Sequence, residues 1–210
     1  MEKQIIISIG RQYGSAGHEI AEKLAKKLDI DLYDRNLFEE IGKIKNIDTN
    51  DLEKYDEVPK KRFFSRTVNG YSNSPEENVA ELQFALLKSK AYDGDSFVVV
   101  GRCSDDLFRG MEGFVSIFIT GEMSEKIKRI INVRHMNEKQ AKKAIERHDR
   151  KRALYHDYFV KDHKWGDCNT YDICLNSSRL GVDATVDFLY EYIKLLRDGK
   201  RLNLVSLPYR

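Results

Sequence analysis

The stretch Gln4-Ile5-Ile6-Ile7-Ser8-Ile9-Gly10-Arg11-Gln12-Tyr13-Gly14-Ser15-Ala16-Gly17-His18-Glu19-Ile20-Ala21 decides the fold. An apolar run typical of a buried strand ends in a loop of small residues, and a helical pattern begins directly after it. Glycines let backbone N–H groups turn inward, and the start of a helix adds unpaired donors, so this order of elements is suited to binding phosphate. The predicted nucleotide-binding residues are Gly10, Arg11, Gly14, Ser15, Ala16, Gly17 and His18.

The loop departs from the phosphate-loop pattern of nucleoside-triphosphate enzymes at its last positions. If Ala16 takes the place of the final loop glycine, Gly17 stands where the pattern has lysine. His18 and Glu19 then stand where it has the Ser/Thr pair. Within Gly14–Gly17, Ser15 carries the only hydroxyl and is the candidate ligand for Mg²⁺ or phosphate. The alternative interpretation is a tight strand-to-helix turn that binds no ligand.

The composition narrows the classes of partner. The chain has 210 residues and a formal charge of +2, from 36 basic and 34 acidic residues, so no global field attracts nucleic acid or membranes. No apolar segment is long enough for a signal peptide or a membrane span, and we expect a cytoplasmic protein. Its three cysteines have no Cys-x-x-Cys spacing and are expected to be buried, reduced thiols. The sequence leaves the oligomeric state open.

Strand-like and helical patterns alternate along the chain. Amphipathic helical patterns follow the loop and fill the gaps between later strands, which predicts a doubly wound α/β fold with a parallel five-stranded sheet. We expect one domain over residues 1–200 and a tail at 201–210. In such sheets ligands bind beyond the carboxyl ends of the strands. The predicted strands are Gln4–Ile9, Asp31–Tyr33, Phe97–Val100, Phe114–Ile119 and Asp172–Leu175.

Five segments, in this order, resemble the cytidylate kinase-like family, a nucleoside monophosphate kinase branch of the P-loop NTPase class. The resemblance implies a three-layer P-loop kinase fold that uses ATP and Mg²⁺ to phosphorylate a nucleoside monophosphate or a similar acceptor. It also implies an acceptor-binding insertion at about 45–75 and a helical lid at about 137–165. Enzymes of that branch commonly have arginine just after the loop glycines, where this chain has His18. The matching segments are Gly10–Gly17, Tyr33–Arg35, Val99–Cys103, Ile145–Tyr158 and Tyr171–Ser177.

Polar residues follow the second predicted strand. The carboxylate of Asp34 can orient an acceptor oxygen or hold a magnesium-bound water, and Arg35 can pair with an acceptor phosphate. Alternatively, Asp34 caps the helix that begins near Asn36. Arg62 and Arg66, in the insertion, are placed to bind the acceptor when the insertion closes.

The third predicted strand ends in Gly101-Arg102, where many P-loop enzymes have a magnesium-linked aspartate. We expect Arg102 to bind an acceptor phosphate or the transferred phosphate, because a guanidinium fork matches phosphate oxygens. Asp105 is its predicted partner. The alternative is a structural salt bridge at the rim of the crevice.

A charged helical segment supplies the lid candidates Arg147 and Arg152. Asp149 lies one turn before Arg152, so the acid can orient the base. Without the resemblance, a solvated face of alternating charge is the simpler interpretation. The histidines His135, His148, His156 and His163 show no metal-ligand spacing with acidic or cysteine partners, and no role is assigned to them.

Two functional hypotheses remain open. The first is an ATP-dependent small-molecule kinase with Arg102, Arg147, Arg152 and Asp34 as its catalytic residues. The second is a catalytically impaired nucleotide-binding regulatory or scaffold protein, which the absent loop lysine favours. A dinucleotide-binding oxidoreductase is excluded because no Gly-x-Gly-x-x-Gly follows the first strand.

Overall fold

A parallel five-stranded sheet forms the centre of the computed structural model, which describes residues 3–34, 36–45, 57–58, 67–68, 71–72 and 74–198. The strands run in the order β2-β5-β1-β6-β7, and every neighbouring pair is parallel. This confirms the predicted α/β fold. Each strand begins and ends within two residues of the predicted positions. The strands are β1 (Ile6–Arg11), β2 (Asp31–Tyr33), β5 (Phe97–Val100), β6 (Phe114–Thr120) and β7 (Ile173–Asn176).

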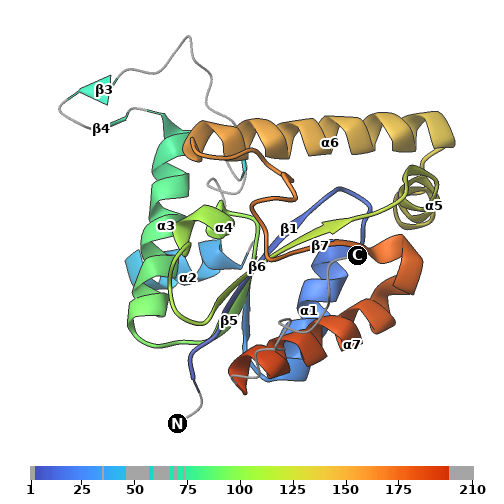
Figure 1. The fold of residues 1–210 in the computed structure, drawn as a ribbon. Helices are drawn as coiled ribbons and strands as arrows, with labels where there is room; N and C mark the ends of the chain where they lie inside the picture. Colours follow the sequence, from blue (N-terminus) through green and yellow to red (C-terminus); the bar gives the residue numbers. More distant parts are fainter. Residues whose placement is uncertain are drawn as a thin grey trace, which may run out of the picture.

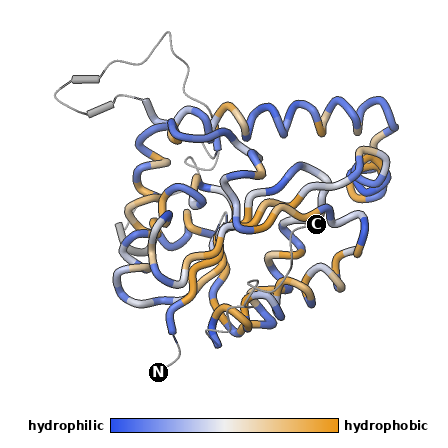
Figure 2. Tube along the Cα trace, viewed as in Figure 1, coloured by the Kyte–Doolittle hydropathy of each residue, from blue (hydrophilic) through white to orange (hydrophobic). Residues whose placement is uncertain are grey.

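Helices cover both faces of the sheet, as Figure 1 shows. On one face, α1 (Gly17–Leu28) and α7 (Ser177–Arg197) pack against apolar side chains of β1, β5 and β6. On the other, α2 (Leu37–Lys45) and α3 (Pro75–Tyr92) enclose a second apolar cluster. Successive side chains of β1 point to opposite faces, so Ile7 belongs to the first cluster and Ile6 to the second. Both faces are buried, which is why the strands are the most hydrophobic segments in Figure 2.

The long polar helix α6 (Glu138–Phe159) crosses the edge at which the strands end (Figure 1). Its first turn is fixed by a capping box in which Asn137 and Gln140 bond to each other's backbone N–H groups. It packs on α5 (Met123–Arg134) through an apolar cluster that includes Ile130 and Ile145. The helix occupies most of the predicted lid region.

A short antiparallel pair, β3 (Thr67–Val68) and β4 (Tyr71–Ser72), lies within the predicted insertion and was not anticipated. Most other residues of the insertion, including Arg62 and Arg66, lie outside the described residues, as do Arg35 and the tail at 201–210.

Two smaller expectations have clear outcomes. Cys103 is buried, but the prediction of burial is wrong for Cys168 and Cys174, whose thiols are free and whose residues are exposed. Among the described residues, no helix is both long and apolar enough to cross a membrane.

Candidate functional site

The loop between β1 and α1 has the backbone geometry of an anion-binding turn. Gly14 and Ala16 both have positive φ, of 85° and 61°, and the Ser15 N–H donates to the Gln12 carbonyl at 3.3 Å. The first helical bond of α1 runs from the Ile20 N–H to the Ala16 carbonyl at 2.9 Å. The N–H groups of the preceding turn therefore have no partner within the helix and carry the positive end of its dipole.

This loop forms one wall of a cleft of about 660 Å³ at the carboxyl ends of the strands. Its volume is in the range of small-molecule sites. Six separated segments of the sequence share this cavity: β1 with the loop and α1, the end of β2, Glu57, the end of β5, α5 and α6. The lining includes Arg11, Gly14, Ala16, Gly17, His18, Asp34, Glu57, Arg102, Arg129, His148, Lys151 and Arg152.

Three guanidinium groups converge on the carboxylate of Glu57 in this cleft. Arg11 Nη1 lies 3.0 Å and Arg102 Nη1 lies 3.4 Å from Glu57 Oε1, and Arg152 Nε lies 3.8 Å from Oε2. Burial alone would raise the pKa of Glu57, but the charges of Arg11, Arg102 and Arg152 outweigh it and hold that pKa well below its usual range. Burial, followed by the charge of Arg11, lowers the pKa of Arg152 to about 10, so this guanidinium stays protonated at neutral pH.

A glycine makes room for this cluster. Gly101 has a φ of 77°, and a Cβ atom placed on it would lie 2.3 Å from Glu57 Oε1 and 2.5 Å from Arg11 Nη1. Any other residue at this position is therefore both strained and in collision with the ion pair. The close approach of Glu57 and Arg11 thus explains why glycine precedes Arg102 at the end of β5.

The side chain of Asp34 makes one contact to the backbone just before α2 and one to His18 at the cleft. Its Oδ1 accepts the Asn36 N–H at 3.0 Å, just before α2, while Oδ2 lies 3.4 Å from His18 Nε2 at the cleft. Arg102 Nη2 donates to the Asp34 carbonyl at 3.0 Å, which ties the ends of β2 and β5 together. The structure therefore brings Asp34, Arg102 and His18 to the same cleft.

Among the described candidate residues, Gly10, Ser15, Asp105 and Arg147 are not part of the cleft lining. Ser15 is 2% exposed and its hydroxyl donates to the Gln12 carbonyl at 2.8 Å, so its proton is used within the turn. Arg147 is exposed and lies beside His148, with Nη2 3.4 Å from the Nε2 of that ring. Successive residues of an α-helix are about 100° apart, so residues five positions apart lie on different faces. Arg152 faces the cleft, and Arg147 therefore faces away from it.

The predicted pairing of Asp105 with Arg102 is wrong. Asp105 Oδ2 lies 2.9 Å from His156 Nε2 and 2.9 Å from His163 Nε2. Burial would raise the pKa of Asp105, but its hydrogen bonds to the two histidines hold that pKa below its usual value. The sequence assigns no role to His156 and His163, because they lie far from Asp105 in the sequence and only the fold brings the three together.

Comparisons with known proteins agree with this geometry. The sequence profile described as the cytidylate kinase-like family matches residues 6–179. The chain belongs to the cytidylate kinase-like family. A solved structure of an uncharacterized protein from Eubacterium ventriosum ATCC 27560 is 32% identical, with a TM-score of 0.72, and the match covers 91% of this chain and 99% of that one.

Another similar structure shows the fold alone. Shikimate kinase from Bacteroides thetaiotaomicron is 14% identical, with a TM-score of 0.52, over 91% of this chain and 99% of that chain. No curated protein matches the chain. Family membership supports a nucleotide or small-molecule kinase.

This cytidylate kinase-like protein braces its loop with a lysine that the sequence did not single out. Lys126, on α5, is 4% exposed; its Nζ lies 2.9 Å from Gln12 Oε1 and 3.6 Å from Asp149 Oδ2. Asp149 Oδ1 in turn accepts the Tyr13 N–H at 2.6 Å. Asp149 therefore ties α6 to the loop and to Lys126, a role that differs from the predicted orientation of Arg152.

Glu57 and Lys126 were missed for different reasons. Glu57 falls in a polar segment without periodicity, and one acid among many carries no signal of its three partners. Lys126 follows an apolar strand within a basic helix, and only the fold shows that it is the buried lysine of that helix.

Replacing Lys126 with methionine should lower the free energy of unfolding by about 1–3 kcal/mol, because Asp149 and Gln12 lose a buried donor. Burial already raises the pKa of Asp149, and the charge of Lys126 opposes that rise. Urea unfolding monitored by circular dichroism measures the change. Lys128→Met is the matched control, since the Lys128 side chain is 69% exposed and pairs only with Glu125 among the described residues. Equal effects of the two variants would contradict the bracing role.

Proposed function

We propose that this protein is an ATP-dependent kinase that transfers the γ-phosphate to a nucleoside monophosphate or a similar acceptor. The observation that carries the proposal is the convergence of Arg11, Arg102 and Arg152 on one carboxylate in the cleft that the loop lines. A cluster of three guanidinium groups that binds one carboxylate has the positive charge and the hydrogen-bond donors to bind a phosphoryl group. Arg11 Nε is also buried without a hydrogen-bond acceptor among the described residues, so the cluster retains a donor.

The residues of the cleft match the needs of phosphoryl transfer. An acceptor oxygen attacks the γ-phosphorus as the bond from that phosphorus to the bridging oxygen breaks, and negative charge spreads over the moving group and the departing diphosphate. N–H groups of the loop and of the first turn of α1 hold the phosphates in line. Arg102 and Arg152 neutralise the charge that develops.

We assign no catalytic-base role to Glu57. Its carboxylate instead occupies the position proposed for the anion of a substrate. A carboxyl group whose pKa is held far below its usual range is a poor proton acceptor at neutral pH. Its carboxylate must give way when a phosphate enters the arginine cluster. The acceptor therefore brings its own negative charge to the cleft, as a nucleoside monophosphate does.

The residues fit ATP and Mg²⁺ without the usual loop lysine. Mg²⁺ prefers oxygen ligands, and the Asp34 carboxylate at the cleft is suited to hold it through a water molecule. When bound, the ion neutralises charge between the β- and γ-phosphates. Arg11 supplies positive charge near the loop, and the ring of His18 lies at the cleft beside it. Arg35, Arg62 and Arg66 are the proposed acceptor-binding residues of the neighbouring segments.

A catalytically impaired nucleotide-binding protein is the second candidate. The position of the loop lysine holds glycine, and the three arginines are already paired with Glu57. If that pairing persists when ATP binds, the protein binds nucleotide and transfers nothing.

Incubation with Mg-ATP and a panel of nucleoside monophosphates, with ADP formation as the readout, separates the two candidates. We expect ADP to form in the presence of one acceptor well above the rate without acceptor. ATP-dependent thermal stabilisation without turnover on any acceptor would instead support the binding protein. A panel of hydroxylated acids without phosphate serves as the control, because these compounds lack the dianion that the cluster is proposed to bind.

A further inference from the structure

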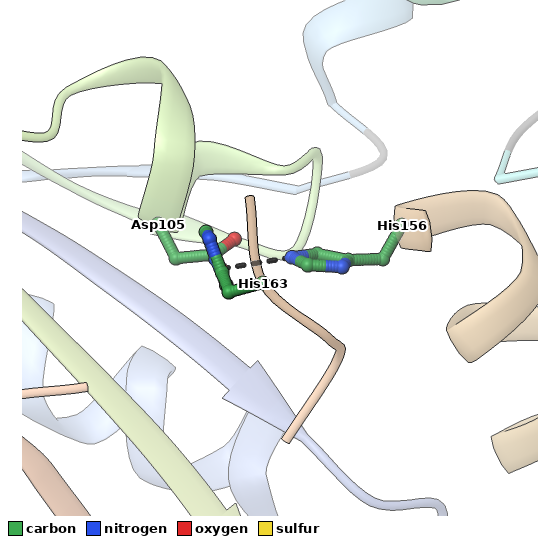
Figure 3. A group of neighbouring side chains, drawn as sticks. All are labelled: Asp105, His156 and His163. Carbon is green, nitrogen blue, oxygen red and sulfur yellow. Dashed lines mark hydrogen bonds and ion pairs between the residues drawn. The ribbon is translucent and has the colours of Figure 1, made fainter. Parts of the chain in front are cut away.

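Three buried side chains that are not part of the cleft lining meet one another, as Figure 3 shows. Asp105 comes from α4 (Ser104–Leu107), His156 from the last turn of α6, and His163 from the segment that follows α6. They are 5%, 4% and 8% exposed. Both Nε2 atoms lie 2.9 Å from the same oxygen, Asp105 Oδ2, and the three potential ligand atoms lie within 4.8 Å of one another.

The second nitrogen of His156 is held as in many metal sites. His156 Nδ1 lies 3.2 Å from Asp157 Oδ1, and that oxygen also accepts the Trp165 N–H at 3.0 Å. Histidines that bind metals commonly donate their other N–H to a carboxylate, which fixes the ring and leaves the opposite nitrogen free to bind the ion. The carboxylate of Asp157 therefore orients the Nε2 lone pair of His156 toward Asp105.

The Nε2 atom of His163 faces both Asp105 and Arg109. It lies 2.9 Å from Asp105 Oδ2 and 3.2 Å from Arg109 Nη2, and a guanidinium only donates hydrogen bonds. A metal ion bound to Nε2 and to the Asp105 carboxylate would use the Nε2 lone pair, so it would leave Arg109 without an acceptor on this ring, as a proton on Nε2 would. Arg109 keeps a second acceptor, the Thr170 carbonyl at 3.4 Å.

We propose that Asp105, His156 and His163 bind a divalent transition-metal ion, with Zn²⁺ the best match. Two imidazoles and one carboxylate form a ligand set typical of zinc, with a fourth position left for water. A cavity of about 20 Å³ adjoins Asp105 and His156, which is room for one water molecule. Zinc bonds of about 2.1 Å place tetrahedral ligand atoms about 3.4 Å apart, so each Nε2 moves about 0.5 Å from Asp105 Oδ2.

The location assigns a structural role to the ion. Asp105 lies three residues after Arg102, and His156 lies one turn after Arg152 on α6. A metal bound to both would fix the turn after β5 against the end of α6. It would therefore hold two arginines of the cleft in register without touching the bound nucleotide, and it differs from the magnesium site proposed at Asp34.

The experiment uses the full chain without a histidine tag and does not depend on activity. After dialysis against Zn²⁺ and then metal-free buffer, we expect about one zinc per chain by atomic absorption. The Tm of chelator-treated protein should rise by about 5–10 °C at a zinc concentration one hundred times the Kd. Co²⁺ should give the visible absorption bands of a four-coordinate site.

The matched variants are His163→Asn and His135→Asn. His135 is exposed at the C-terminus of α5, so its variant should keep the stoichiometry, the Tm rise and the cobalt bands. His163→Asn should lose them. Wild-type protein without bound zinc and without cobalt bands would overturn the proposal, even if His163→Asn does not fold. The same Tm rise in both variants would overturn it as well, since zinc would then bind elsewhere.

Discussion

Replacing Arg102 with alanine should lower kcat/KM for phosphoryl transfer by about a thousandfold, the scale at which an arginine contributes to such reactions. Arg102 is 2% exposed and donates to the Asp34 carbonyl at 3.0 Å while it faces Glu57. Its guanidinium links the ends of β2 and β5 at the point where the proposed acceptor meets the γ-phosphate. Steady-state ADP formation with the acceptor found in the panel measures the loss.

The backbone at this position does not confuse the result. Arg102 has a φ of 59°, and alanine bears the same left-handed strain as any other L-residue with a side chain. Arg102→Lys is the matched variant, because it keeps the charge and loses the fork that bonds Asp34 and Glu57 together. We expect an intermediate rate for it. Unchanged kcat/KM in Arg102→Ala, with ATP binding and Tm retained, would contradict a role for Arg102 in transfer.

The fold was predictable because its signals are local. The run from Ile5 to Ile9 is apolar at nearly every position, as a strand covered on both faces must be, and helical patterns lie between most of the main strands. The pair β3 and β4 was missed because each strand has two residues, which is too short for any periodicity. The strands that the sequence did not predict are therefore those with too few residues to show a pattern.

The site was predictable only in part, because contacts between distant segments leave no trace in spacing. Arg102 and Asp34 follow strands directly, and the end of a parallel strand places its next residue at the cleft. Asp105 stands at the same edge, yet the turn of α4 directs it to His156 and His163. Both Arg147 and Arg152 are arginines of the same charged segment, so the sequence does not distinguish them. Only the packing of α6 on α5 decides which of them faces the loop.

Arg152 on α6 is the second residue whose replacement should have a large effect on phosphoryl transfer. Replacing Arg152 with alanine should lower kcat/KM by at least about a hundredfold, the effect of removing one preorganised donor from a transition state. Arg152 Nη1 donates to the Arg11 carbonyl at 3.0 Å, and its guanidinium carbon lies 5.8 Å from the centre of the Tyr13 ring. The side chain thus reaches from the proposed lid to the loop, and its loss removes both a cation and the contact that aligns α6.

Arg150→Ala is the matched control, since Arg150 is exposed on the same helix and is not part of the cleft lining. Both variants remove one positive charge from α6, so a general change in the field of the helix affects them alike. Steady-state kinetics at low and high salt separates that field from direct contact. We expect Arg150→Ala to stay within about twofold of wild type, because interactions between exposed charges are weak and screened. Equal losses in the two variants would assign the effect to the charge of the helix and remove Arg152 from the proposed catalytic group.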